Sequence, residues 1–307
     1  IEKKILYFSF IFKILNKLCN TNTFDLTSEL SFYLFGSIYG NKTSNKKIKQ
    51  INPGTILNNK TEELENYSYY SLNDRLINNQ HKNISVEQIY SNLDYIMEKY
   101  SVSQADWSLM LSSGVDSNII KNILNNKVTT YTLLFHDHKI YSEETLIEKS
   151  KNNIFLEFDY MKQKEYVIDD YIRSMEQPTI DGLNIFIITK LIKKYNNKNK
   201  VCLTGLGLDE LLNGYNPQKK ILLSKMIFNL TKIIGNNFFN KYLKNMNPIE
   251  YDSYFKKNIN FKNYILFRLV TPFEYLSKTY DYNELKRSYE EIFSIFDDKI
   301  KRLKEFT

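Results

Sequence analysis

The 307-residue chain has few cysteines and no long apolar run, and each absence excludes a class of protein. Its two cysteines, Cys19 and Cys202, are too few for a disulfide framework or a four-cysteine metal site, which predicts a reducing, cytoplasmic location. The apolar run Ile5–Phe12 ends at Lys13 and is too short to cross a bilayer, so no membrane association is expected. No repeat of about 20–50 residues is visible, which argues against a solenoid or a propeller.

The composition is that of a soluble globular protein, with 42% hydrophobic and 25% charged residues. Lys and Arg exceed Asp and Glu by 42 to 35, which gives a formal net charge of +7. Such an excess suits a nucleic-acid or phosphate partner. Because Lys, Asn, Ile and Tyr are abundant along the whole chain, we interpret the charge as compositional bias and expect no nucleic-acid partner.

Strands and helices are expected to alternate in the middle of the chain. Short runs of apolar residues predict strands at Trp107–Leu111, Val128–Phe135, Ile154–Phe158 and Val201–Thr204. Helices are expected at Ser85–Tyr100, Asn118–Leu124, Glu143–Ser150 and Ile185–Tyr195. This alternation predicts an α/β fold, a Rossmann-like parallel sheet with helices on both faces, followed by a helical C-terminal region beyond Tyr215. Ligands of such sheets bind at the carboxyl ends of the strands.

A Ser/Gly loop, Leu111–Ser117, follows the first expected strand. Its small residues let backbone N–H groups approach a phosphate, and the helix after it directs its positive end to the same place. The hydroxyls of Ser112 and Ser117 add donors. Asp116 would repel phosphates unless a divalent cation lay between them, which predicts Mg²⁺. The loop lacks the Gly-Lys-Ser/Thr of a Walker motif.

A second loop, Thr204–Glu210, follows the fourth expected strand. Its two glycines allow close approach of the backbone to a ligand, and Glu210 stands where a dinucleotide-binding motif has Gly or Ala. The acidic pair Asp209 and Glu210 begins a helix, where acidic residues are also ordinary. With Asp116 at a neighbouring strand end, Asp209 could complete a two-carboxylate Mg²⁺ site.

Three ordered segments resemble motifs of the asparagine synthetase family. Ser112–Ser117 is similar to Ser-Gly-Gly-x-Asp-Ser, Glu176–Asn184 to a Pro-x-x-Asp-Gly segment, and Thr204–Tyr215 to Ser-Gly-x-Gly-x-Asp-Glu-x-x-Gly-Gly-Tyr. The resemblance implies a synthetase domain at 76–307 with an adenine nucleotide alpha-hydrolase-like fold. It implies that residues 1–75 are the remnant of a glutaminase domain and a linker.

The resemblance also implies a reaction. A substrate carboxylate attacks the α-phosphorus of ATP, pyrophosphate leaves, and ammonia displaces AMP from the acyl-adenylate to form an amide. The expected protein is therefore an asparagine synthase-type ligase and amidotransferase, with aspartate or another carboxylate as substrate and ATP and Mg²⁺ as cofactors. Ammonia from glutamine would come from a glutaminase domain N-terminal to this chain, and a homodimer is compatible with the family.

The same resemblance assigns roles to individual residues. It assigns nucleotide binding to Leu111, Ser112, Ser113, Gly114, Asp116, Ser117, Leu133, Thr204, Gly205 and Gly207. It assigns the metal to Asp116 and Asp209.

Leu206 departs from the family pattern. The best-understood members have Glu between the two glycines, where it manages the proton as the amine attacks, and Leu cannot do this. We expect Glu176, Asp181 or Glu210 to supply the base, unless ammonia arrives neutral. Leu206 also keeps open a substrate other than aspartate, such as a sugar acid, a peptide or an intramolecular amide.

The ends of the chain depart from the family as well. The chain begins at Ile1 rather than the glutaminase cysteine, and the Arg-x-Pro-Phe-Leu-Asp segment is missing after Pro272. We expect a sequence cut at both ends. Two further hypotheses stay open: a tRNA-modifying enzyme that shares the pyrophosphate loop, and a non-catalytic nucleotide-binding domain. The tRNA hypothesis suits the basic charge but does not explain Thr204–Tyr215.

Overall fold

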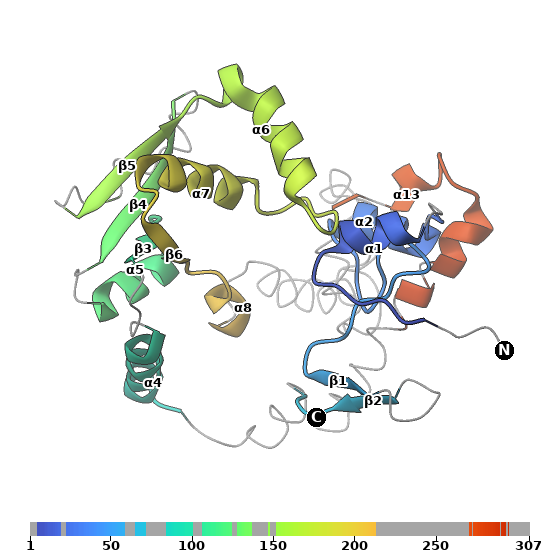
Figure 1. Ribbon diagram of the computed structural model, residues 1–307, viewed down its shortest axis with the longest axis horizontal. Helices are drawn as coiled ribbons and strands as arrows, with labels where there is room; N and C mark the ends of the chain where they lie inside the picture. The colour runs from blue at the N-terminus through green and yellow to red at the C-terminus, as the bar shows by residue number, and fades with distance from the viewer. Residues whose placement is uncertain are drawn as a thin grey trace, which may run out of the picture. The chain divides into compact units, whose positions relative to one another are not determined.

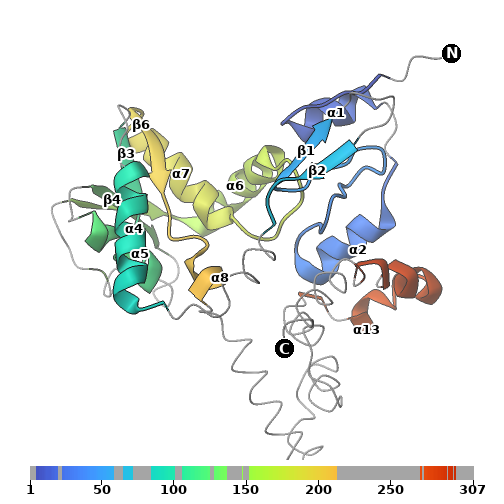
Figure 2. The same cartoon turned by 90° about the horizontal axis from the view of Figure 1, so that it is seen from below.

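The computed structural model describes residues 5–19, 23–58, 65–71, 84–100, 106–124, 128–136, 147, 152–212, 270–271, 273–288, 290–292 and 294. The chain divides into two compact units (Figures 1 and 2). The first unit comprises 1–81, 175–180 and 216–307, and the second comprises 82–174 and 181–215. The helix expected at Glu143–Ser150, apart from Ile147, and most of the helical region expected beyond Tyr215 lie outside the described residues.

The second unit contains a parallel four-stranded sheet. Its strands are β3 (Asp106–Met110), β4 (Thr129–Phe135), β5 (Asn153–Phe158) and β6 (Asn199–Leu203). The spatial order is β5-β4-β3-β6, and all three neighbouring pairs are parallel. From β3 the chain moves outward through β4 to β5 and then returns to the other side of β3 to form β6. The strand order therefore reverses between β3 and β6, which is where ligands bind in open α/β sheets.

Helices cover both faces of this sheet, which confirms the predicted Rossmann-like α/β fold. On one face α7 (Leu183–Tyr195) places Ile188 and Ile192 against Tyr131 and Leu156, and α6 (Tyr160–Ser174) packs beside it. On the other side lie α5 (Val115–Ile123) and α4 (Val86–Tyr100), which contact each other (Figures 1 and 2). A short helix, α8 (Leu208–Leu212), follows β6.

The first unit contains α1 (Phe12–Leu18), α2 (Leu26–Phe35), the antiparallel pair β1 (Thr55–Asn58) and β2 (Glu65–Ser68), and α13 (Phe273–Leu276). Two local signals define the ends of α2. The Asp25 side chain accepts a hydrogen bond from the Thr27 N–H at 3.1 Å, which caps the helix start. Gly36 ends the helix with a φ of +75°, a left-handed conformation that favours glycine.

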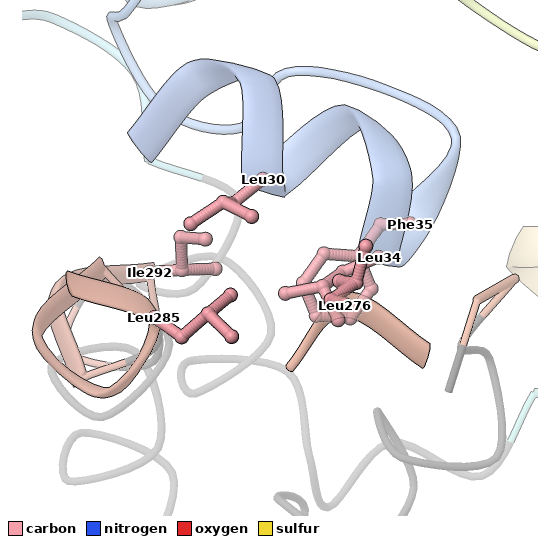
Figure 3. Packing of buried hydrophobic residues seen from close by; sticks show 6 residues of the cluster. All are labelled: Leu30, Leu34, Phe35, Leu276, Leu285 and Ile292. Carbon is pink, nitrogen blue, oxygen red and sulfur yellow. The ribbon is translucent and has the colours of Figure 1, made fainter. Parts of the chain in front are cut away.

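The core of the first unit joins segments that are far apart in the sequence. Apolar side chains of α2 meet side chains from the C-terminal part of the chain, and the buried members are Leu30, Leu34, Phe35, Leu276, Leu285 and Ile292 (Figure 3). The segment 175–180 also belongs to this unit, since the Ile180 N–H donates to the Gly36 carbonyl at 3.0 Å. Among the helices that the structure describes, none is both long and apolar enough to span a membrane.

Candidate active site

The two loops that the sequence singled out touch each other at the carboxyl ends of β3 and β6. Gly205 carries the contact: a Cβ atom at this position would lie 2.9 Å from both the Asp116 Cβ and the Ser117 backbone nitrogen. No larger residue fits there without displacing the backbone at the start of α5. The strand order and this contact together bring both loops to the point where the sheet reverses its order.

Hydrogen bonds from β4 and from within the loop hold the first loop. Leu111 is buried, its N–H donates to the Tyr131 carbonyl at 2.8 Å, and its carbonyl accepts the Thr132 hydroxyl at 3.0 Å. The Ser117 hydroxyl lies 3.0 Å from the Ser112 hydroxyl and accepts the Ser112 N–H at 3.1 Å. These bonds fix the turn before α5, so that the N-terminus of a nine-residue helix opens beside it.

A cavity of about 850 Å³ opens between the two loops and the N-terminal end of α7. This volume is within the range of small-molecule sites. Most residues predicted from the sequence line it, namely Leu111, Ser112, Gly114, Asp116, Ser117, Leu133, Thr204, Gly205, Gly207, Asp209 and Glu210. Ser113 is exposed and does not line the cavity.

Other lining residues were not predicted from the sequence. They are Met110, Val115, Phe135, Tyr160, Leu183, Asn184, Ile185, Ile188 and Leu206, the last of which had been noted only as a departure from the family. A sequence signal existed for several of them. Met110 ends β3, and Phe135 and Tyr160 stand at or just after the ends of β4 and β5. The rule that parallel sheets bind ligands at their carboxyl ends would have selected these positions.

Three carboxylates converge on one side of the cavity. Burial raises the pKa of Asp116 above its ordinary value, and the negative charges of Asp209 and Glu210 raise this pKa further, against a hydrogen bond from the Asp209 N–H that lowers it. No Lys, Arg or His is among the described residues that line the cavity. The site is therefore acidic at the loops and apolar over most of its remaining wall.

The carboxylates of Asp116 and Asp209 fit a magnesium ion that is held together with a substrate phosphate. Mg²⁺ in nucleotide sites takes oxygen ligands from one or two carboxylates, from phosphates and from water. Within the described ranges there is no group of three or more His, Cys, Asp and Glu residues able to hold a metal without other ligands. The crowding of negative charge around Asp116 is what a cation would relieve.

The three predicted bases have different surroundings. Glu210 is exposed and lines the cavity. Asp181 does not line it; its backbone carbonyl accepts a hydrogen bond from the Tyr171 hydroxyl. Glu176 lies in the first unit, where its carboxylate accepts the Lys13 N–H at 3.4 Å. Of the three side chains, only that of Glu210 belongs to the cavity wall within the second unit.

Comparison with known proteins identifies the family. No curated protein matches the chain. A family model described as Asparagine synthase matches residues 88–286, which is more than half of the chain and includes both loops. That family comprises ATP-dependent ligases that form carbon–nitrogen bonds. The chain, with its two touching loops at the reversal point of a parallel sheet, belongs to the asparagine synthase family.

Proposed function

We propose that the chain is the synthetase part of an asparagine synthase-type enzyme, which activates a carboxylate with ATP and joins it to ammonia. The contact of Gly205 with Asp116 and Ser117 is the observation that carries the proposal. It supports the proposal because serines of the first loop and carboxylates of both loops line the same cavity. Both are needed when two negatively charged reactants, a carboxylate and a triphosphate, have to meet.

In this proposal the nucleotide lies along the carboxyl edge of the sheet. By resemblance to the family, Leu111, Leu133, Thr204 and Gly205 would contact the adenosine, and all four line the cavity. Ser112, Gly114 and Ser117 would hold the pyrophosphate portion, with the helix N-terminus behind them, whereas the predicted Ser113 does not line the cavity. The Ser117 hydroxyl already bonds within the loop, so its contribution to phosphate binding would require those bonds to rearrange.

The chemistry consists of two displacements. A carboxylate oxygen of the substrate forms a bond to the α-phosphorus, and the bond from that phosphorus to the bridging oxygen breaks, so that pyrophosphate leaves with the electron pair. The nitrogen of ammonia then bonds to the acyl carbon, and AMP leaves with the electrons of the carbon–oxygen bond. One proton is released from nitrogen. Glu210 is the nearest candidate to accept it, because it is the predicted base that lines the cavity.

Asp116 and Asp209 would hold Mg²⁺ in this scheme. When bound, the ion would neutralise charge on the phosphates of ATP. The residues of the chain supply the remaining functions: the loops orient the α-phosphate, and the apolar wall excludes water from an acyl-adenylate that water would hydrolyse.

Aspartate is the acceptor that the family description suggests, and glutamine is the proposed source of ammonia. The source would be a glutaminase domain N-terminal to the synthetase domain, with residues 1–75 as its remnant and linker and 76–307 as the synthetase domain. The proposal places the reaction in asparagine biosynthesis in the cytoplasm when aspartate is the acceptor.

Exchange of labelled pyrophosphate into ATP tests the proposal, because exchange requires that the first displacement be reversible and dependent on a carboxylate. We expect exchange in the presence of Mg²⁺ and an acceptor acid, and none without the acid. Nucleotide binding without exchange for any carboxylate would show a binding domain rather than a ligase. Exchange that requires tRNA would instead support a tRNA-modifying enzyme.

A further inference from the structure

Two apolar side chains on the cavity wall are much more exposed than a packed core residue. Val115 is 72% exposed and Leu206 is 74% exposed, and both line the cavity. Val115 precedes Asp116 in the first loop, and Leu206 follows Gly205 in the second. Because Gly205 packs against Asp116, Val115 and Leu206 are each one residue away from the contact between the two loops.

The local backbone fixes the position of Leu206. The Leu206 N–H donates to the Thr204 hydroxyl at 3.4 Å, and Gly207 has a φ of +101°, which turns the chain into α8. Neither Val115 nor Leu206 belongs to a core cluster of the described residues. Exposed apolar area inside a binding cavity favours an apolar ligand group, since covering it removes that area from water.

The charges of the wall point in the same direction. The described lining residues include Asp116, Asp209 and Glu210 but no Lys, Arg or His. The α-carboxylate of aspartate would find no cationic side chain among them, and only its α-ammonium would be matched in charge. A substrate with an uncharged group next to its reacting carboxylate needs no cationic partner there.

The reaction sets where this group must lie. The reacting carboxylate has to reach the α-phosphorus, and the phosphates lie at the two loops in the proposed function. The group attached to that carboxylate therefore lies beside the loops rather than at the adenosine end, which brings it to Val115 and Leu206.

We propose that the acceptor is a carboxylic acid with an uncharged, apolar group next to its reacting carboxylate, and that Leu206 and Val115 bind this group. The inference rests on the proposed function and specifies the substrate class of the same site. Leu206 is then a specificity-determining residue, and the asparagine synthase reaction operates on an acid other than aspartate.

A matched pair of acids tests the inference. Isovalerate is aspartate with the α-ammonium and α-carboxylate replaced by two methyl groups, so both acids carry one net negative charge and differ in whether these two substituents are charged or apolar. We expect kcat/KM for pyrophosphate exchange to be at least roughly tenfold higher with isovalerate, by the usual discrimination of an apolar pocket. Leu206→Ala should lower the isovalerate value by roughly tenfold, and Leu206→Met should retain most of it. Leu206→Arg should shift the preference toward aspartate.

Ile172→Ala is the matched control, because Ile172 is 57% exposed in α6 of the same unit and does not line the cavity. Its exchange rates should equal those of the unaltered protein. Exchange with aspartate at least as fast as with isovalerate overturns the inference and leaves the proposed function intact, as does an unchanged acid preference in Leu206→Ala. Absence of exchange with both acids overturns the inference, and absence of exchange with every carboxylate, in a protein that binds ATP, overturns the proposed function as well.

Discussion

The site of the second unit and the core of the first unit are both assembled from distant segments, but by different means. Ser112–Ser117 and Thr204–Glu210 each follow a strand, and the parallel sheet brings their ends to one edge. In the first unit, Leu30 and Leu285 meet through side-chain packing without a shared sheet (Figure 3). The comparison separates two kinds of long-range contact: one that a topological rule predicts, and one that only three-dimensional packing reveals.

The largest expected effect is on the chemistry of the second unit. Asp116→Asn removes one of the two carboxylates proposed to hold Mg²⁺, and we expect pyrophosphate exchange to fall by about 10³-fold. The melting temperature should stay the same or rise slightly, because the substitution relieves repulsion from Asp209. Asp106→Asn, at the opposite end of β3, is the matched control and should retain full exchange. Retained exchange in Asp116→Asn would contradict the assignment of the first loop.

The next effect is on the stability of the first unit. Leu30→Ala removes a side chain that is 1% exposed, and we expect the free energy of unfolding to fall by about 3 kcal/mol. Leu285→Ala should have a similar cost, and the double variant should cost less than the sum, because the two residues share a cluster. Denaturant unfolding measures all three variants. Leu57→Ala, on the half-exposed β1, is the control; strict additivity would mean that Leu30 and Leu285 do not interact.

The contact between the loops can be tested with two glycines that are constrained in different ways. At Gly205 a methyl group would meet backbone, whereas at Gly207 nothing lies within 4 Å but φ is +101°. We expect Gly205→Ala to cost about 2 kcal/mol of stability and to lower exchange about tenfold, since the loops must separate. Gly207→Ala should cost about 1 kcal/mol through backbone strain alone. If Gly205→Ala and Gly207→Ala lost the same amount of exchange, the contact between the loops would have no larger role in activity than the conformation of the second loop.

The smallest effect concerns an ion pair of the first unit. Burial acts to raise the pKa of Glu291, but hydrogen bonds from Lys42 and Thr27 and the charge of Lys42 outweigh it, so the pKa lies below its ordinary value of 4.5. A carboxyl with a lower pKa in the folded state stabilises the protein above the unfolded value, and this contribution is lost as the pH falls through the folded value. Because the side chain is 46% exposed, solvent screening limits the effect to about 0.5 kcal/mol.

Glu291→Gln should therefore lower the melting temperature slightly at pH 7 and have no effect near pH 3. Glu290→Gln, at the exposed neighbouring position, should change it at neither pH. If Glu291→Gln lowered the melting temperature more at pH 3 than at pH 7, the pH dependence would be opposite to the one expected, and the stabilising role of Lys42 would be contradicted.

Sequence reasoning predicted the sheet well and the first unit poorly, for physical reasons. The four expected strands match β3, β4, β5 and β6 within one or two residues, because buried parallel strands are continuous apolar runs. Helix α6 was missed although Val167 and the neighbouring apolar residues follow a helical period. The packing of α2 against α13 could not be predicted, because the periodicity of a helix shows that it has an apolar face but not which other face it packs against.

The residues of the candidate site also fall into two groups, those that the sequence predicts and those that it does not. The loop residues were predicted because small and acidic residues after a strand are a local signal for phosphate and metal. Leu183 and Ile188 on α7 were not predicted, because in the sequence they look like any other apolar helix positions. The prediction that Glu176 acts as a base remains untested, and its carboxylate lies in the other unit.

The first unit is built from three separate segments, 1–81, 175–180 and 216–307, and this affects when it can fold during synthesis. Synthesis proceeds from the N-terminus, and the second unit is complete once residue 215 has been added. At that moment Leu30 and Leu34 still lack Leu276, Leu285 and Ile292, which are translated later. The apolar face of α2 therefore remains uncovered while the parallel sheet can already form, and it is a target for chaperones until these three residues have been translated.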